Sequence, residues 1–187
     1  IPLETLRAHI AMVPQEAFLF SLSLADNVAY GLPRTDMEAV RRAARRAQLA
    51  KDVDELSSGW ETLVGERGVM LSGGQRQRTA LARALALDPA VLILDDTLSA
   101  VDAETEAAIQ EELRQVFRGR TVVVVASRVS SVQEADRVAV LDAGRLVEYG
   151  TPRELQAQGG LYARLAQEQQ REAALAELAP DEGEGGR

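Results

Sequence analysis

The chain has 187 residues, of which 46% are hydrophobic and 27% charged, a balance typical of a globular protein and not of a disordered one. Its apolar runs, such as residues 122–126, fall far short of the ~20 residues that a membrane-spanning helix needs. The absence of cysteine excludes disulfides and thiolate metal sites, and the single histidine excludes a histidine-rich zinc site. A net charge of −8 argues against a nonspecific nucleic-acid binder.

The first third of the chain predicts a strand, a loop and a helix. Residues 10–13 form a short apolar run typical of a strand, and Gln15 follows Pro14 in a loop. Thr35 and Glu38 have the spacing of a capping box, and apolar residues then recur at helical spacing as far as residue 47.

The middle of the chain predicts helix, strand, helix, strand. A helix is expected to begin near Gly74 and to end before Asp88 and Pro89. The continuous apolar runs 91–94 and 121–126 indicate strands buried on both faces, as in a parallel sheet. The amphipathic helix between them has Asp102 as its expected N-cap, which makes a βαβ unit.

The last third predicts a hairpin and then helix. Residues 138–141 and 145–149 read as two strands joined by the turn 142–144. A helical region is expected from Pro152 to about Leu178, and the glycine-rich acidic tail 179–187 is expected to be disordered.

The most informative stretch is a hydroxyl, two glycines and an amide at a helix start: Leu71, Ser72, Gly73, Gly74 and Gln75. Such a turn is often only a structural cap. It also suits an anion, because glycines let a phosphate approach the backbone and the helix N-terminus attracts negative charge.

Two aspartates further along the chain support a ligand-binding role for this turn. Asp95 and Asp96 follow the apolar run 91–94, at the carboxyl end of an expected buried strand. Ligands of α/β folds bind at that edge, and an aspartate there typically holds Mg²⁺ directly or through water.

With these motifs the chain resembles the C-terminal part of an ABC transporter nucleotide-binding domain, from about residue 3 to residue 165. Residues 71–75 match the signature motif in full, and residues 91–95 match the Walker B strand. Ser99 and Asp102 fall in a stretch similar to the D-loop, Gln15 resembles the Q-loop glutamine, and Glu66 and Arg67 resemble the X-loop of exporters.

The resemblance implies an α/β P-loop NTPase fold: a RecA-like parallel sheet with a helical subdomain over about residues 21–87, in a partial domain spanning residues 1–178. It implies ATP and Mg²⁺ as ligands. Asp95 would hold Mg²⁺, Gln15 would sense Mg²⁺ and the attacking water, and Asp102 would link two ATP sites across a dimer. Glu66 and Arg67 would touch the coupling helices of a membrane domain, which places the domain on the cytoplasmic side of the inner or plasma membrane.

Three departures from the family pattern are visible. The phosphate-binding motif G-x-x-x-x-G-K-[ST] is missing, because the single lysine, Lys51, does not follow a glycine-rich loop. The sequence also has no initiator methionine, so we expect a truncated piece of a longer protein. Asp96 stands where relatives carry the glutamate that acts as general base, and Ser127 stands where they carry the switch histidine. We expect the isolated chain to lack ATPase activity.

These departures predict an asymmetric dimer. ATP sites of the family are composite, so Asp96 and Ser127 would weaken this chain's own site, while its intact signature would serve the site of a different partner subunit. Two alternatives stay open: a soluble ABC-type ATPase without a membrane domain, against which the X-loop match argues, and a non-hydrolysing regulatory module, which the two degenerate positions favour.

Overall fold

The computed structural model describes residues 1–65, 69–97 and 103–178, and they divide into two compact units, Ile1–Val125 and Ala126–Arg187. None of the described helices is long and apolar enough to cross a membrane.

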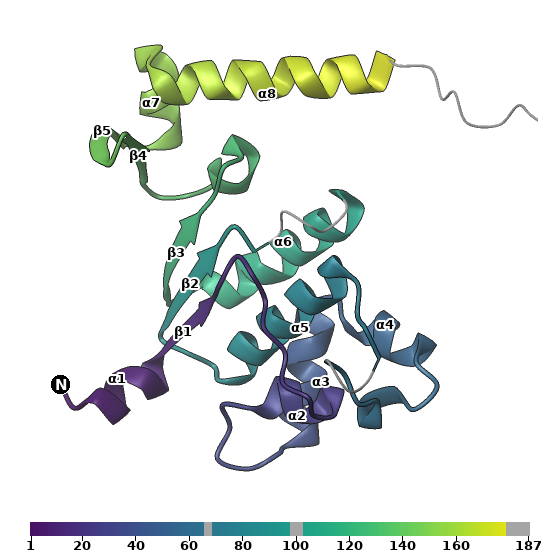
Figure 1. Ribbon diagram of the computed structural model, residues 1–187. Coiled ribbons are helices and arrows are strands. Elements are labelled where there is room, and N and C mark those ends of the chain that lie inside the picture. The colour runs from purple at the N-terminus through teal and green to yellow at the C-terminus, as the bar shows by residue number, and fades with distance from the viewer. Residues whose placement is uncertain (66–68, 98–102, 179–187) are drawn as a thin grey trace, which may run out of the picture. The chain divides into compact units, whose positions relative to one another are not determined.

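The first unit is built on a three-stranded parallel sheet with strand order β1-β2-β3 (Figure 1). Its elements, in chain order, are α1 (Leu3–His9), β1 (Ile10–Val13), α2 (Leu24–Ala29), α3 (Met37–Arg46), α4 (Ala50–Glu55), the 3₁₀ helix η1 (Gly59–Glu61), α5 (Gly73–Ala86), β2 (Val91–Asp95), α6 (Ala103–Phe117) and β3 (Thr121–Val125). The strands expected from the runs 10–13, 91–94 and 121–126 and the helix expected from Gly74 are confirmed, whereas α1, α2 and α4 escaped the sequence analysis.

The sheet is buried on one face only, so the expectation of strands buried on both faces is wrong. Ala11, Leu92 and Leu94 face a core shared with α5 and α6 and are almost completely buried. On the other face, Met12 and Val123 flank Ile93 in register and are about half exposed. The four consecutive valines of β3 carry no alternation in the sequence, so only the packing of helices on one side distinguishes the two faces.

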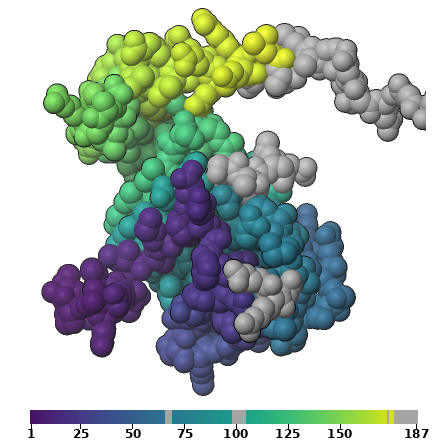
Figure 2. Space-filling view, viewed as in Figure 1, coloured from purple at the N-terminus to yellow at the C-terminus, as the bar shows by residue number. Residues whose placement is uncertain are grey.

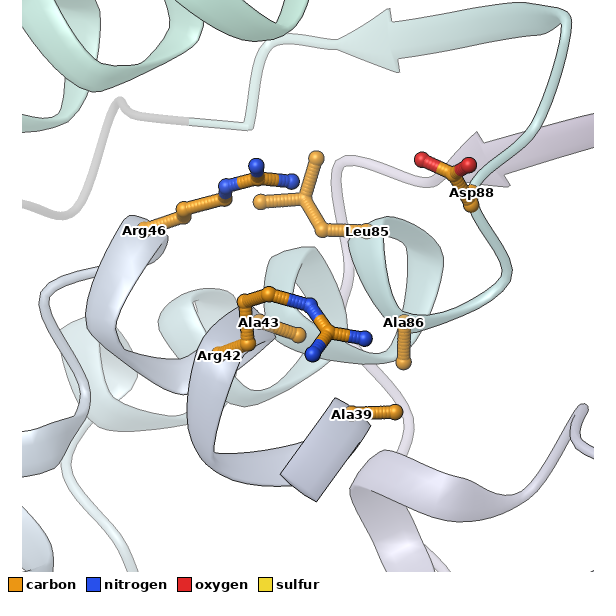
Figure 3. A pocket seen from close by; sticks show the side chains of 7 residues that line it. All are labelled: Ala39, Arg42, Ala43, Arg46, Leu85, Ala86 and Asp88. Atoms are coloured by element: carbon orange, nitrogen blue, oxygen red, sulfur yellow. The ribbon is translucent and has the colours of Figure 1, made fainter. Parts of the chain in front are cut away.

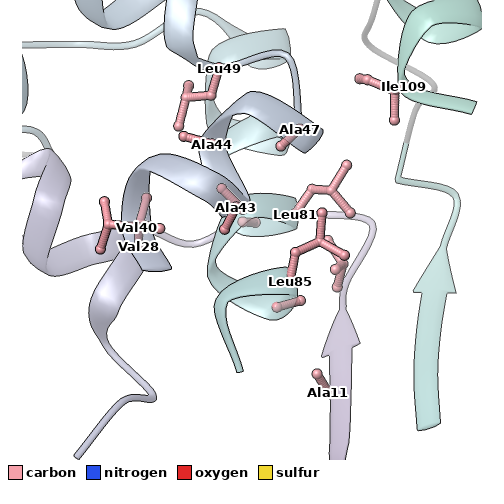
Figure 4. Packing of buried hydrophobic residues seen from close by; sticks show 14 of the residues in the cluster. Ala11, Val28, Val40, Ala43, Ala44, Ala47, Leu49, Leu81, Leu85 and Ile109 are labelled. Carbon is pink, nitrogen blue, oxygen red and sulfur yellow. The ribbon is translucent and has the colours of Figure 1, made fainter. Parts of the chain in front are cut away.

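Helices α2, α3 and α5 pack together around a small-residue core. Val28 and Val40 meet Ala43, Leu81 and Leu85, all nearly inaccessible to solvent (Figure 4). Small side chains on α3 let its axis approach α5 closely, which explains the many contacts between these helices.

The start of α3 differs from the expectation by one residue. The N-cap is Asp36, whose carboxylate accepts hydrogen bonds from the N–H groups of Glu38 and Ala39. Thr35 instead donates its hydroxyl hydrogen to Asp26 at 3.4 Å. Aspartate and threonine both cap helices, and aspartate wins here because it lies one residue closer to the first free amides.

The second unit contains the 3₁₀ helix η2 (Val129–Val132), the antiparallel hairpin of β4 (Val138–Asp142) and β5 (Arg145–Gly150), and the helices α7 (Pro152–Gln158) and α8 (Leu161–Leu178). The expected hairpin and terminal helical region are therefore confirmed. Thr151 and Glu154 form a full capping box at α7, and Gly159 ends that helix in the left-handed conformation. The predicted disordered tail lies outside the described residues.

Candidate functional site

The carboxyl edge of the sheet brings three predicted site residues together. Asp95 ends β2, Asp96 follows it, and Gln15 lies two residues beyond the end of the neighbouring strand β1. The Gln15 Nε2 donates to the Asp96 Oδ2 at 3.5 Å, across 81 residues of chain. Because adjacent parallel strands end at the same edge, this contact follows from the topology.

Asp96 has an unusual backbone. Its φ of +43° lies in the left-handed region, where aspartate and asparagine are several-fold enriched among residues other than glycine. Its N–H donates to the Val125 carbonyl at 2.8 Å, which continues the β2–β3 ladder by one residue. The carboxylate is therefore held at the sheet edge by a turn that suits this residue type.

The turn at residues 71–75 is the N-terminus of α5. Ser72 is the N-cap: its Oγ accepts from the Gln75 N–H at 3.2 Å, and its own N–H donates to the Gln75 Oε1 at 3.0 Å. Gly73 and Gly74 are the first helical residues, and the buried Leu71 anchors the turn in the core. The side chain of Ser72 is exposed, as an anion-binding hydroxyl must be.

Two residues that the sequence analysis missed support this turn. Asp52 of α4 forms a bidentate ion pair with Arg78 of α5, and it also accepts a hydrogen bond from Gln75. The three residues lie on two helices, 23 and 26 residues apart. No spacing rule in one sequence could pair them, because the pairing is set by the packing of α4 and α5.

A third missed residue, Arg83, ties α5 to the segment that follows Gln15. Its guanidinium donates to the Phe18 and Asn27 carbonyls at 3.0 and 2.8 Å and to the Asn27 Oδ1 at 2.9 Å. It also lies over the rings of Phe20 and Tyr30, which stack with centroids 4.0 Å apart. Burial lowers the pKa of Arg83 below its ordinary value, but the group stays protonated at any physiological pH.

The segment from β1 to α2, drawn in purple to violet, lies at the surface of the first unit (Figure 2). Phe18 and Tyr30 on it are 66% and 57% exposed. Beside it, Leu63 and Met70 are 58% and 75% exposed, and an isolated bridge joins Leu63 to Ser23. We call Phe18, Tyr30, Leu63 and Met70 the apolar surface. Large apolar side chains exposed on neighbouring segments can form a contact with another protein or domain.

Ser127 belongs to the second unit, and its side chain is exposed. Gln169 of α8 holds its backbone: the Gln169 Nε2 donates to the Ser127 carbonyl at 3.2 Å, and the Gln169 Oε1 accepts from the Val129 N–H at 2.8 Å. The stretch that resembles the family's switch segment is thus fixed by one side chain of α8. Four other predicted residues, Glu66, Arg67, Ser99 and Asp102, lie outside the described residues.

A cleft of about 270 Å³ lies between α3 and the end of α5 (Figure 3). Arg42, Arg46 and Asp88 supply its charges, and none of the predicted site residues lines it. Arg42 is paired with Glu38 at 3.2 Å, and Asp88 with Arg120. Because Arg42 and Asp88 already have partners in the protein and no predicted site residue lines the cleft, it gives no second candidate site.

The donor set at the sheet edge fits Mg²⁺. Asp95, Asp96 and Gln15 offer carboxylate and amide oxygens, and Mg²⁺ in nucleotide sites is held by one or two carboxylates together with phosphate oxygens and water. Within residues 1–65, 69–97 and 103–178, no three acidic, histidine or cysteine side chains cluster as a complete metal cage.

Comparison with known proteins identifies this arrangement. The sequence model of the family described as ABC transporter matches residues 2–99, which include Gln15, the 71–75 turn and both aspartates. The chain belongs to the ABC transporter family. The residues that resemble the signature motif form the N-terminus of α5, and those that resemble the Walker B strand form β2.

Two similar proteins are named as a flippase and as an ABC transporter ATP-binding protein. The chain is 52% identical over 164 residues to the ATP-dependent lipid A-core flippase of Alkalilimnicola ehrlichii, covering 87% of the chain and 28% of that protein. It is 47% identical over 173 residues to the ABC transporter ATP-binding protein YknU of Bacillus subtilis, covering 92% of the chain and 30% of that protein.

A solved structure shows the same fold. A bacterial Atm1-family ABC exporter with ATP bound superposes with a TM-score of 0.85 and 39% identity, over 90% of this chain and 30% of that one. The predicted α/β ABC ATPase fold with a parallel sheet is thereby confirmed. The chain spans about three tenths of the length of these relatives.

Proposed function

We propose that the chain is part of the ATP-binding domain of an ABC exporter, which couples ATP binding and hydrolysis at a domain dimer to transport across a membrane. The observation that carries this proposal is the contact between Gln15 and Asp96 at the carboxyl edge of the sheet. It brings the glutamine that resembles the Q-loop residue next to the position of the general base. A metal ion, the attacking water and the base would then lie next to one another. The exporters named above support the direction of transport.

In this proposal the chain's own catalytic site is degenerate. An aspartate is one methylene shorter than the glutamate of relatives, and a misplacement of about 1 Å can cost on the order of 100-fold in rate. Asp96 also accepts a hydrogen bond from the Gln15 amide, which occupies one of the carboxylate oxygens that a base would offer to water. Ser127 carries no imidazole that could reach a phosphate.

The signature turn serves the site of the partner domain. The N–H groups at the start of α5 and the helix dipole favour an anion there. Ser72 uses an Oγ lone pair as its cap acceptor, and its O–H remains able to donate to a phosphate oxygen. A different subunit with its own glutamate would then supply the productive base, which makes the complex a heterodimer.

The apolar surface is the proposed contact with the membrane domain. Phe18 follows Gln15 by three residues, so a helix that docks on this surface has a short path to the Q-loop. Arg83 lies over the stacked rings of Phe20 and Tyr30, and these contacts hold the surface in one conformation before a partner binds. Glu66 and Arg67 belong to the same proposed contact.

The test is the steady-state ATPase of the complete transporter that contains this chain. Asp96→Asn keeps the shape and the left-handed backbone preference, so it removes the negative charge of the base without disturbing the turn. We expect near-wild-type turnover from Asp96→Asn and strong loss from Ser72→Ala or Gly74→Asp. The double change Asp96→Glu with Ser127→His should raise turnover at this chain's own site.

Each alternative predicts a different result. In a homodimer both ATP sites carry Asp96, so Asp96→Asn removes the remaining activity. That result would refute the heterodimer. In a regulatory module ATP binding persists but the Asp96→Glu and Ser127→His pair restores no turnover. In a soluble ATPase, Met70→Asp on the apolar surface leaves turnover unchanged, whereas in an exporter it abolishes stimulation by the transported substrate.

A further inference from the structure

Asp52 occupies the centre of a small polar network between α4 and α5. Its Oδ1 and Oδ2 accept from the Arg78 guanidinium at 2.8 to 3.0 Å, and its Oδ1 also accepts from the Gln75 Nε2 at 3.3 Å. The side chains of Asp52 and Arg78 are only 15% and 12% exposed. An ion pair so shielded from water requires good geometry, and both carboxylate oxygens are used here.

The network continues to the signature serine through the two ends of one amide. The Gln75 Nε2 is bound to Asp52, and the Gln75 Oε1 accepts from the Ser72 N–H at 3.0 Å. A flipped amide would set its NH₂ against the Ser72 N–H and its oxygen against the Asp52 carboxylate, and both contacts would repel. Asp52 therefore selects one orientation of the Gln75 side chain.

That orientation closes the cap. With the Gln75 Oε1 on the Ser72 N–H, the reciprocal bond from the Gln75 N–H to the Ser72 Oγ fixes the serine rotamer. The serine Oγ is then held in one place, with its O–H still available to donate. Arg78 neutralises the Asp52 carboxylate, so this support adds little negative charge beside a turn that must accept an anion.

We propose that Asp52 is a positioning residue for Ser72, acting through Gln75 so that the signature hydroxyl and the first amides of α5 meet the phosphate of a nucleotide held by the partner domain. The inference rests on the proposed function of the signature turn. It is separable from a purely structural role of the ion pair, because Arg78 takes part in the ion pair but does not touch Gln75 in the network described above.

The first experiment uses the 187-residue chain and compares Asp52→Ala with Arg78→Ala. Both variants break the same ion pair, so both should lower the free energy of unfolding by similar amounts. Only Asp52→Ala releases the Gln75 amide, and we expect it to raise the hydrogen-exchange rate of the Ser72 N–H by roughly 5–10-fold, the loss of one hydrogen bond. Asp54→Asn, an exposed neighbour on α4, should change neither quantity.

Equal Ser72 exchange rates in Asp52→Ala and Arg78→Ala would overturn the proposal, because the ion pair alone would then explain the effect. Exchange rates of core amides, such as that of Leu81, report the global loss of stability and correct for it.

The second experiment measures the ATPase of the complete transporter. Asp52→Ala should lower kcat more than Arg78→Ala does, and should add little in a Gln75→Ala background, because both changes act on the same amide. Additive losses would overturn the inference. Unchanged turnover in Ser72→Ala would refute the proposed function instead, while the exchange result on the chain would still decide the role of Asp52.

Discussion

Replacement of Arg83 by alanine is the most informative single perturbation of the first unit. The side chain makes three hydrogen bonds, two to carbonyls and one to the Asn27 Oδ1. Asn27 is completely buried, and its own amide donates to the Phe20 and Ser23 carbonyls at 3.0 and 3.1 Å. Arg83 and Asn27 together thus fix the fold of the segment between β1 and α2.

The expected loss follows from these contacts. Hydrogen bonds from a charged donor contribute about 1.5–3 kcal/mol each, but desolvation, which also lowers the pKa of Arg83, opposes part of that gain. We expect Arg83→Ala to cost about 3 kcal/mol of unfolding free energy, in the range seen when one partner of a shielded charged network is removed. Arg83→Lys should cost about half as much, because an ammonium can replace only part of the planar fork.

Urea unfolding of the chain, followed by the fluorescence of Trp60, measures this loss. Trp60 is the single tryptophan and packs against the core of the first unit. A loss of 3 kcal/mol lowers the urea midpoint by about 1–3 M at an unchanged m-value. The control is Arg42→Ala, whose exposed pair with Glu38 is expected to contribute under about 1 kcal/mol. An Arg83→Ala midpoint equal to that of the control would refute the reasoning.

Three further predictions concern the core and the second unit. Leu81→Ala should destabilise the first unit by about 3–5 kcal/mol in the same urea assay, because the fully buried side chain leaves a cavity between helices. Glu148→Ala should cost about 2 kcal/mol in a thermal melt followed by circular dichroism, because that carboxylate accepts from the first two amides of α8, whereas an unchanged melt would contradict the assignment. The hydrogen bond from the Thr151 backbone N–H lowers the pKa of the Glu154 carboxyl below its ordinary value, so this stabilisation is complete above that ordinary value and is lost as the pH falls through the folded pKa. The stability gap between the wild type and Glu154→Gln should therefore be widest near neutral pH and close in acid, and a gap that is independent of pH would count against it.

Local patterns predicted the elements of the fold well. The helix start at Ser72 could be read because the hydroxyl, the glycines and Gln75 lie within one turn of each other. The same locality explains the error at α3, where Thr35 and Asp36 compete for one cap. Helices α1, α2 and α4 have only six or seven residues, too few for an apolar period to stand out.

Non-local features of the site could be predicted only in part. Gln15 and Asp96 could be placed at one edge because parallel strands align their ends, although they lie 81 residues apart. The partners of Asp52 and Arg83 could not be predicted, because each depends on how a short helix or loop packs on α5. A half-buried charged residue is recognised in a sequence only when its partner is close along the chain.

Helix α5 connects these non-local contacts in a way that bears on coupling. Its N-terminus presents Ser72 and is tied to α4 through Asp52, while Arg83, about three turns further along, is tied to the segment that follows Gln15. A helix with its hydrogen bonds intact moves as a rigid rod, and the small side chains that pack α3 against α5 leave little room for bending. A partner that moves the apolar surface should therefore also move Ser72, because the hydrogen bonds of Arg83 to the Phe18 and Asn27 carbonyls hold this surface to α5. The signal from a docked membrane domain would thus reach the signature turn and the Q-loop through one common segment, residues 15–30.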